Sequence, residues 1–371
     1  MMFEMIAITI AAVLFAGHLV TIALYQARLD APPRRMSKIG LPPLTVLRPV
    51  VGSDPLDAET LGSTFAQDYP DYQVIFCVPS DRDASLPLLR RLIAENPLVP
   101  ARILTGQVPR SGNPKLDNLW KGWDAATTDY VVMTDSNLLM PPTYLRQLVA
   151  QWDEGTGLVS CPAIGIRPQG FAASLECAFL NSNQARLQFA AASLGRGFAQ
   201  GKTLFWNRPM LNAAGGLDPL GRNLAEDVSA TKLVRSWGLS VRLPNLPFAQ
   251  PIGRRTLDQV WQRQLRWSRV RRDGFPGLFL GEPVNGSVLA MIAFALALGH
   301  ASLVWMIPAL VLWYGAEVWL MVQAGWPAGW RDILALPVRD AMMPALWAAT
   351  FLRKGFDWRG TEMSGEGVVT L

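Results

Sequence analysis

Between residues 44 and 161, short apolar runs alternate with stretches whose apolar positions recur at helical spacing. The apolar runs predict strands at 44–47, 72–78, 102–105, 130–134 and 158–161. The amphipathic stretches predict helices at 56–67, 85–95, 115–126 and 142–152. Strands that alternate with helices of this length are typical of parallel βαβ units, so the predicted fold class is α/β with a doubly wound, mostly parallel sheet.

After residue 162 the periodicity is weaker. The pattern predicts helices at 171–192, 228–237 and 256–270, with strands at 203–206 and 240–243. Glycines mark a loop-rich region between about 195 and 216. Loops above a rigid sheet often carry binding and catalytic groups, so this region is expected to border a functional site.

Both ends of the chain are apolar. The stretch 3–25 is interrupted only by Glu4 and His18, and about 20 apolar residues suffice to cross a bilayer. The basic residues follow the stretch instead of preceding it, at Arg28, Arg34, Arg35 and Lys38. This order favours an uncleaved anchor over a signal peptide and predicts that the following residues lie in the cytosol.

The C-terminal apolar block, 288–325, is 38 residues long, enough for two linked spans. A weaker stretch at 338–352 is compatible with an interfacial helix or a further span, and both alternatives stay open. The sequence therefore predicts an anchor at 1–27, a basic Pro-rich linker at 28–43, a cytosolic α/β domain at 44–280 and a membrane region with a polar tail at 281–371.

The amino-acid composition narrows the classes of molecule that the protein is expected to bind. Of 371 residues, 50% are hydrophobic and 17% are charged, with a net charge of +5 in which arginine outnumbers lysine. An arginine-rich chain suits phosphate or anionic lipid, whereas no zinc-finger, RRM-like or helix-turn-helix pattern indicates nucleic acid. The three cysteines form no C-x-x-C pair and predict neither a disulfide framework nor a zinc site.

Carboxylates follow two of the predicted strands. Asp135-Ser136-Asn137 comes directly after the strand at 130–134, and Asp83 follows the strand at 72–78, with Asp81 as its competitor. The carboxyl ends of parallel strands share one edge of a sheet, so Asp83 and Asp135 are expected to face one crevice. Asp135 is suited to hold Mg²⁺ against a diphosphate. The alternative is a turn-forming strand end.

Two further features lie beyond the first half of the sheet. Glu226-Asp227 precedes a predicted helix and is either part of a site or a first-turn charge at the helix start. Arg263, Arg266 and Trp267 lie within one predicted helix, where residues three apart share a face. Two guanidinium groups there can clamp a phosphate, or the helix can lie on anionic lipid headgroups.

An ordered set of segments resembles the ceramide glucosyltransferases, family 21 of the glycosyltransferases. The set comprises Pro49-Val-Val-Gly52, Asp83, Asn113-Pro-Lys115, Asn118-Leu119, Asp135-Ser136, Gly170-Phe-Ala-Ala173, Leu175-Glu176, Ala214-Gly-Gly-Leu217, Ala225-Glu-Asp227 and Arg263-x-x-Arg266-Trp267. It runs in order from about residue 40 to 275 and continues more weakly at Arg339-Asp340 and Asp357-Trp-Arg-Gly360.

The resemblance implies a GT-A fold and inverting transfer of a sugar, favouring glucose, from a UDP-sugar to a lipid hydroxyl on the cytosolic face. It makes Asp227 the general base and Asp135 the ligand of a divalent cation, Mg²⁺ or Mn²⁺. The residues implied to bind the donor are Pro49, Asp83, Lys115, Asp135, Arg263, Arg266 and Trp267. It also implies a place in glycolipid and sphingolipid metabolism, with the bilayer and its lipids as partners.

The chain departs from the family pattern at two positions. Asn137 stands where many relatives carry a second metal-binding aspartate, and Gln184-Ala-Arg186 stands where the animal enzymes have His-Pro-Arg. The resemblance favours a ceramide-like acceptor, and the second departure weakens that assignment and leaves a hopanoid or diacylglycerol as alternatives. A processive polysaccharide synthase and a non-catalytic membrane scaffold are the competing functions. The scarcity of lysine indicates a bacterial origin, which would place the protein in the inner membrane.

Overall fold

The computed structural model describes residues 2–32, 34, 37–222, 225–352, 356–358 and 361–363. Several residues named above lie outside these ranges: Arg35, Arg359, Gly360 and most of the polar tail. The chain divides into two compact units. One contains residues 1–31, 165–190 and 252–356, and the other contains 32–164, 191–251 and 357–371. The predicted α/β domain, 44–280, is thus distributed over both units.

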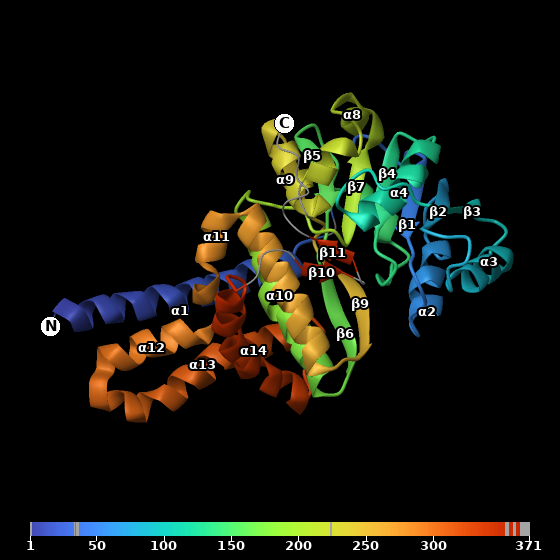
Figure 1. Cartoon of the computed structure of the whole chain (residues 1–371). Coiled ribbons are helices and arrows are strands. Elements are labelled where there is room, and N and C mark those ends of the chain that lie inside the picture. The colour runs from blue at the N-terminus through green and yellow to red at the C-terminus, as the bar shows by residue number, and fades with distance from the viewer. Residues whose placement is uncertain are drawn as a thin grey trace. The chain divides into compact units, whose positions relative to one another are not determined.

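The second unit is built on a seven-stranded sheet in the order β3-β2-β1-β4-β7-β5-β8 (Figure 1). Its strands are β1 (Leu44–Pro49), β2 (Tyr72–Val78), β3 (Ala101–Thr105), β4 (Tyr130–Thr134), β5 (Thr156–Ser160), β7 (Thr203–Asn207) and β8 (Ser240–Arg242). The first four strands pair in parallel, whereas β7 runs antiparallel to both β4 and β5. The predicted mostly parallel α/β sheet is confirmed.

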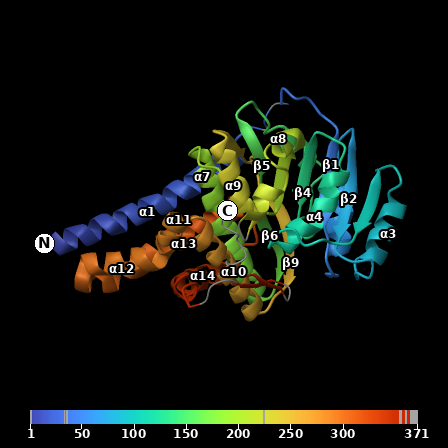
Figure 2. The same cartoon turned by 45° about the horizontal axis from the view of Figure 1, so that its top comes forward.

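Helices connect these strands, and Figure 2 shows α4 lying across the sheet. They are α2 (Asp57–Gly62), the 3₁₀ turn η1 (Ser63–Phe65), α3 (Leu86–Glu95), α4 (Pro114–Ala125), α5 (Tyr144–Val149), α8 (Arg208–Ala213), the 3₁₀ turn η3 (Asp218–Arg222) and α9 (Glu226–Ser236). The apolar runs became strands because both faces are covered: Val46, Leu47 and Ile75 are wholly buried. α4 packs so closely that a Cβ at Gly122 would lie 2.5 Å from Cys77 Sγ.

The antiparallel strand β7 determines what faces the end of β4. Thr134 pairs with Thr203, so the next residue outward on each strand, Asp135 and Lys202, also lie opposite one another. The backbone N–H of Asp135 donates to the carbonyl of Lys202 at 3.2 Å. A lysine is thereby placed against the carboxylate that ends β4.

The first unit contains the N-terminal and C-terminal helices and most of the helical segment 171–193. They are α1 (Met2–Leu29), α6 (Phe171–Ala178), the π-helix η2 (Phe179–Ala185), α7 (Arg186–Ser193), α10 (Leu257–Gly274), α11 (Pro276–Leu280), the 3₁₀ turns η4 (Glu282–Asn285) and η5 (Gly299–Ala301), α12 (Ser287–Leu298), α13 (Ser302–Gln323) and α14 (Trp330–Ala349). The helix predicted at 171–192 is one continuous helical segment with a π-helix in the middle. Two further pairs, β6 (Ala163–Gln169) with β9 (Phe248–Arg254) and β10 (Phe356–Trp358) with β11 (Thr361–Met363), form small sheets.

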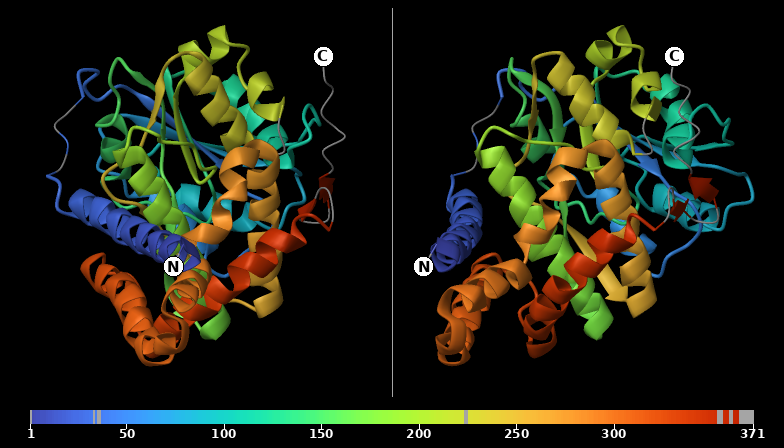
Figure 3. Two further views of the ribbon diagram at one scale, coloured as in Figure 1. Left: turned by 90° about the vertical axis from the view of Figure 1, so that its left-hand side faces the viewer. Right: turned by 60° about the vertical axis from the view of Figure 1, so that its left-hand side comes forward.

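Two segments, Met2–Leu29 and Ser287–Gln323, are long and apolar enough to cross a membrane, judged by length and composition. α12 has 12 residues and extends about 18 Å, short of a ~30 Å hydrocarbon core. α13 has 22 residues and extends about 33 Å, which is sufficient. α1 packs against α12 and α13 within this unit (Figure 3).

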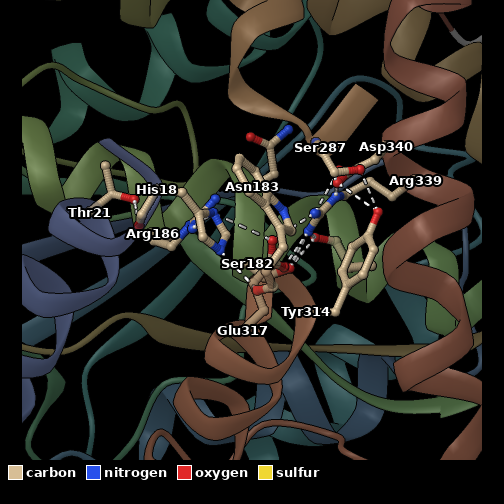
Figure 4. A network of polar contacts seen from close by, with 12 residues as sticks. His18, Thr21, Ser182, Asn183, Arg186, Ser287, Tyr314, Glu317, Arg339 and Asp340 are labelled. Atoms are coloured by element: carbon tan, nitrogen blue, oxygen red, sulfur yellow. Dashed lines mark hydrogen bonds and ion pairs between the residues drawn. The ribbon is translucent and has the colours of Figure 1, made fainter. Parts of the chain in front are cut away.

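A buried polar network joins the helices of this unit (Figure 4). Arg339 of α14 donates to both carboxylate oxygens of Glu317 on α13, at 2.9 and 3.0 Å, and to Asp340 at 2.7 Å. Arg186 donates to His18 Nδ1 at 3.0 Å, and since arginine is only a donor, the His18 proton is on Nε2, which donates to the Trp313 carbonyl. α1 is therefore fixed to the C-terminal helices by polar contacts as well as by apolar packing.

Candidate active site

Asp135 lies at the carboxyl edge of the sheet between two lysines. Its Oδ1 is 2.7 Å from Lys115 Nζ and its Oδ2 is 3.1 Å from Lys202 Nζ. Lys202 also donates to Asn137 Oδ1 at 2.9 Å. Burial alone would raise the pKa of the Asp135 carboxyl, but the two lysines outweigh burial and hold that pKa well below its usual range. Asp135 is thus a firmly ionised carboxylate.

The start of α4 positions Lys115. Asn113 caps the helix by accepting from the backbone N–H groups of Lys115 and Leu116 at 3.0 and 3.2 Å, and Pro114 occupies the first helical position. The Lys115 ammonium then contacts Asp135, the Gly201 carbonyl and Glu226, the last at 2.7 Å. The sequence Asn113-Pro-Lys115 is therefore a helix start that places one ammonium group in a polar cluster formed by Lys115, Asp135, Gly201 and Glu226.

The start of α9 supplies two carboxylates. Its N-cap is Ala225, so Glu226 and Asp227 are first-turn residues and not the cap. Glu226 bridges Lys115 and the Asn113 side-chain amide, which is 2.7 Å away. Asp227 accepts from the backbone N–H of Gly201 at 2.9 Å. The contacts of both side chains reach well beyond their own helix, which a simple helix-start role does not require.

Burial raises the pKa of Asp227 to about 6, with the neighbouring negative charge of Glu226 adding to the effect. A carboxylate with a pKa near the working pH can both accept and release a proton, which is the property of a general base. The pKa values of Asp135 and Asp227, both predicted as site residues, are therefore shifted in opposite directions, down for Asp135 and up for Asp227.

Asp83 and Pro49 lie at the same edge of the sheet. Pro49 ends β1, and Asp83 follows β2, the parallel neighbour of β1. The Asp83 carboxylate accepts from the Gly52 N–H at 3.0 and 3.1 Å and from the Ser85 hydroxyl at 2.7 Å. Asp81 is exposed on the preceding turn. The structure thus joins Asp83, not the competing Asp81, to the loop after β1.

Arg48 is a contributor that the sequence patterns did not indicate. Its side chain is wholly buried, and it donates to the carbonyls of Ser136 and Leu138 at 2.9 and 3.2 Å. Burial lowers the pKa of this guanidinium to about 10, so it keeps its charge at neutral pH. Arg48 therefore holds in place, through the Ser136 and Leu138 carbonyls, the loop that carries Asp135 and Asn137.

Arg263, Arg266 and Trp267 lie on α10 in the other unit, each partly buried. Arg263 pairs with Glu176 of α6, which is completely buried, and its guanidinium lies 6.0 Å from the Trp267 ring centre. Arg255 approaches the same carboxylate at 3.4 Å. A role for Arg263 in phosphate binding therefore has to coexist with an ion pair inside its own unit.

The side-chain oxygens at the end of β4 are ligands of the kind that a hard cation prefers, but together they carry only one negative charge. Asp135 and Asn137 direct one carboxylate and one amide oxygen toward a single cationic group, the Lys202 ammonium. Mg²⁺ commonly takes one or two protein carboxylates and completes its shell with water and substrate phosphates. Within the described ranges, no group of three or more His, Cys, Asp or Glu side chains could hold a metal on its own. The residues fit a cation that shares its ligands with a bound diphosphate.

The mixed sheet, with acidic and basic side chains gathered beyond the carboxyl ends of its parallel strands, defines a GT-A-type glycosyltransferase fold. The mannosyltransferase PcManGT from Pyrobaculum calidifontis, solved in complex with GDP-Man and Mn²⁺, has this fold. It aligns with a TM-score of 0.55 and 20% identity over 91% of this chain and 99% of that one.

The chain belongs to glycosyl transferase family 21, whose sequence profile matches residues 7–366. It is 28% identical to ceramide glucosyltransferase 1 of Caenorhabditis elegans over 262 residues, which are 70% of this chain and 56% of that protein. It is 22% identical to ceramide glucosyltransferase 3 of the same organism, over 93% of this chain and 77% of that one. The first of these matches thus spans only about half of the relative's length.

Proposed function

We propose that this protein is an inverting, UDP-sugar-dependent glycosyltransferase that transfers a hexose, with glucose favoured, to a hydroxyl of a ceramide-like membrane lipid. The names of its family 21 relatives support the sugar and the acceptor. The observation that carries the proposal is a pair of carboxylates whose pKa values are shifted in opposite directions, Asp135 held ionised between two lysines and Asp227 with a pKa raised to about 6.

In the proposed reaction Asp227 accepts the proton of the acceptor hydroxyl. The acceptor oxygen forms a bond to the anomeric carbon while the bond from that carbon to the diphosphate breaks on the opposite side. The configuration inverts, UDP leaves with the bonding electrons, and the proton remains on the Asp227 carboxyl until the product departs. A positioned base of this kind typically contributes about 10²–10⁴-fold to a rate.

The departing diphosphate gains negative charge, and Lys115 and Lys202 supply positive charge next to Asp135. Asp135 and Asn137 would hold Mg²⁺ or Mn²⁺, which when bound adds further positive charge at the diphosphate. Asp83 and Pro49 would border the nucleotide. Arg263, Arg266 and Trp267 would bind the diphosphate and border the acceptor entrance.

A lipid acceptor requires the catalytic unit to work at a membrane surface. The apolar segments Met2–Leu29 and Ser287–Gln323 support membrane insertion, and the basic residues after the first of them support a cytosolic sheet unit. In this arrangement the acceptor stays in the bilayer and the UDP-sugar arrives from the cytosol.

The test is transfer by the purified full-length chain. Detergent-solubilised protein is incubated with Mg²⁺ or Mn²⁺, UDP-glucose, UDP-galactose or UDP-N-acetylglucosamine, and ceramide, diacylglycerol or a hopanoid. Mass spectrometry should find a lipid heavier by one hexose, and NMR of that product should find an anomeric configuration opposite to that of the donor. Asp227→Asn should lower the rate by about 10² or more while leaving UDP binding unchanged. Full activity of Asp227→Asn would refute the base assignment.

The same assay separates the competing functions. A long polymeric product would indicate a processive polysaccharide synthase. Transfer to diacylglycerol or a hopanoid but not to ceramide would keep the chemistry and change the acceptor. If no donor, metal and lipid combination gives a product, a non-catalytic scaffold replaces the enzyme.

A further inference from the structure

The Lys202 ammonium group lies between the side-chain oxygens of the two proposed metal ligands, Asp135 and Asn137. Lys202 Nζ lies 3.1 Å from Asp135 Oδ2 and 2.9 Å from Asn137 Oδ1. Because lysine is only a donor, the Asn137 side chain must present its carbonyl oxygen here, the same atom that would ligate a cation. A divalent cation bound to these two oxygens at about 2.0–2.6 Å would coincide with the ammonium group.

We propose that Lys202 holds the cation position between Asp135 and Asn137 in the donor-free protein and gives it up only when a diphosphate arrives, so that a divalent cation enters together with the donor. The inference rests on the proposed donor site. It assigns Lys202 as a residue that controls metal entry, a role distinct from that of Lys115.

Charge balance leads to the same order of binding. A bare divalent cation would add two positive charges beside Lys115 and Lys202, whose ammonium groups already contact both oxygens of Asp135. A complex of the cation with the diphosphate of a UDP-sugar adds no net charge, because the diphosphate carries two negative charges. Glu226 already pairs with Lys115, so the positive charge that a bare cation meets at the Asp135–Asn137 position is the Lys202 ammonium, and like charges this close in a partly buried site repel strongly.

The surroundings of the two lysines indicate which one makes way. Lys115 is held at three acceptors, Asp135, Glu226 and the Gly201 carbonyl. Lys202 is the one that bridges Asp135 to Asn137, so a cation bound there must displace Lys202 and can leave Lys115 in place. The displaced ammonium, on its flexible four-carbon chain, is then available to the arriving diphosphate.

The test measures cation binding directly. Mn²⁺ is titrated into the purified full-length protein with and without saturating UDP, free Mn²⁺ is read from its EPR signal, and the Mn²⁺ bound by UDP alone is measured without protein and subtracted. The wild type should bind Mn²⁺ roughly tenfold or more tightly with UDP than without it. Lys202→Met should bind Mn²⁺ without UDP roughly tenfold more tightly than the wild type, because the competing ammonium is gone.

Lys38→Met is the matched control, since Lys38 is highly exposed and pairs with Glu154 at the surface. It should behave like the wild type. Lys202→Gln is the second variant in case Lys202→Met does not fold, and it should shift Mn²⁺ binding in the same direction.

Three outcomes separate the inference from the proposed function. Equal Mn²⁺ affinity in the wild type and both Lys202 variants without UDP overturns the inference. UDP binding, measured by equilibrium dialysis, with no Mn²⁺ binding under any condition also overturns it and leaves the donor site standing. Failure of the wild type to bind UDP with or without Mn²⁺ refutes the proposed function itself.

Discussion

Gly201 is the residue at which the candidate site has least room. Its N–H contacts Asp227, its carbonyl contacts Lys115, and a Cβ at this position would lie 2.8 Å from Glu226 Oε1 and 3.3 Å from Lys115 Nζ. Contacts this short force neighbouring atoms to move. Since both neighbours are held by other polar contacts, the displacement would spread through the cluster.

Gly201→Ala should therefore lower transfer activity by about 10²-fold, the scale of a displacement of about 1 Å in a site, with a small change in unfolding temperature. Steady-state kinetics and thermal unfolding together check this. Gly277→Ala is the control, because a Cβ at Gly277 meets nothing within 4 Å. Wild-type activity of Gly201→Ala would show that the cluster is not needed in its observed geometry.

Titration of Asp227 gives a second prediction at this scale. A base must be deprotonated, so kcat/KM should rise with pH through a limb near 6, where Asp227 titrates. In Glu226→Gln the repelling charge is lost and the limb should move to lower pH. It should not reach the ordinary aspartate value of 3.8, because burial is the larger cause of the shift.

The measurement is kcat/KM against pH for the wild type and Glu226→Gln. Glu95→Gln serves as the control, since Glu95 is an exposed residue paired with Arg91 one helical turn away. An unchanged acidic limb in Glu226→Gln would argue that the group titrating in the profile is not Asp227.

Site residues differed in how far the sequence could reveal them. Asp135 and Asp83 follow buried strands, and the rule that parallel strands share a carboxyl edge is enough to bring them to one edge of the sheet. Lys202 reaches Asp135 only because β7 is antiparallel, and a strand pattern carries no information on direction. The signal that the sequence offered was the scarcity of lysine, since a chain with only six lysines gives each of them more weight as a candidate. In the structure two of the six contact this one carboxylate.

At the level of secondary structure, the boundaries of β2 and β4 were predicted to the residue, because each is an apolar run with polar neighbours. β6 and β9 were missed. Each contains both a glycine and a proline, which interrupt a strand pattern and belong to edge positions. The π-helix was also missed, since one wider turn inside a longer helical pattern changes the spacing of its apolar positions too little to be recognised from the sequence.

The buried network of the terminal helices could not be predicted either, since His18 and Trp313 are 295 residues apart in the chain. It gives a prediction at the element scale. Glu317→Gln removes the charge that faces Arg339, which is wholly buried. Breaking one partner of a buried pair leaves an uncompensated charge and costs about 3–5 kcal/mol. Thermal unfolding in detergent should show a large decrease.

The matched control for Glu317→Gln is Arg91→Gln, which breaks the exposed Arg91–Glu95 pair. Exposed pairs contribute about 0–1 kcal/mol, so its unfolding temperature should change little. Equal shifts in both variants would mean that the network does not fix α1 and α14 in the folded protein.

At the scale of the whole molecule, the surface of α13 is the feature that a water-soluble fold does not explain. Ile307 and Val311 lie one turn apart on this helix, with 71% and 65% of each residue exposed. Exposed apolar residues are common singly, but an apolar face along a 22-residue helix is typical of contact with lipid. Leu98 and Val108 of the sheet unit are also exposed, at 95% and 66%.

Leu98 and Val108 serve as the comparison pair, because they are at least as exposed as Ile307 and Val311 respectively but lie in the sheet unit. If α13 lies in the bilayer, Ile307→Asp/Val311→Asp buries two carboxylates in hydrocarbon, at about 2.5–3.5 kcal/mol each near the helix centre. Because α1 can still anchor the chain, the measurement is the amount of folded protein that accumulates in the membrane fraction, which should fall for this variant and stay at the wild-type level for Leu98→Asp/Val108→Asp. Equal accumulation of both variants would place the exposed face of α13 outside the hydrocarbon.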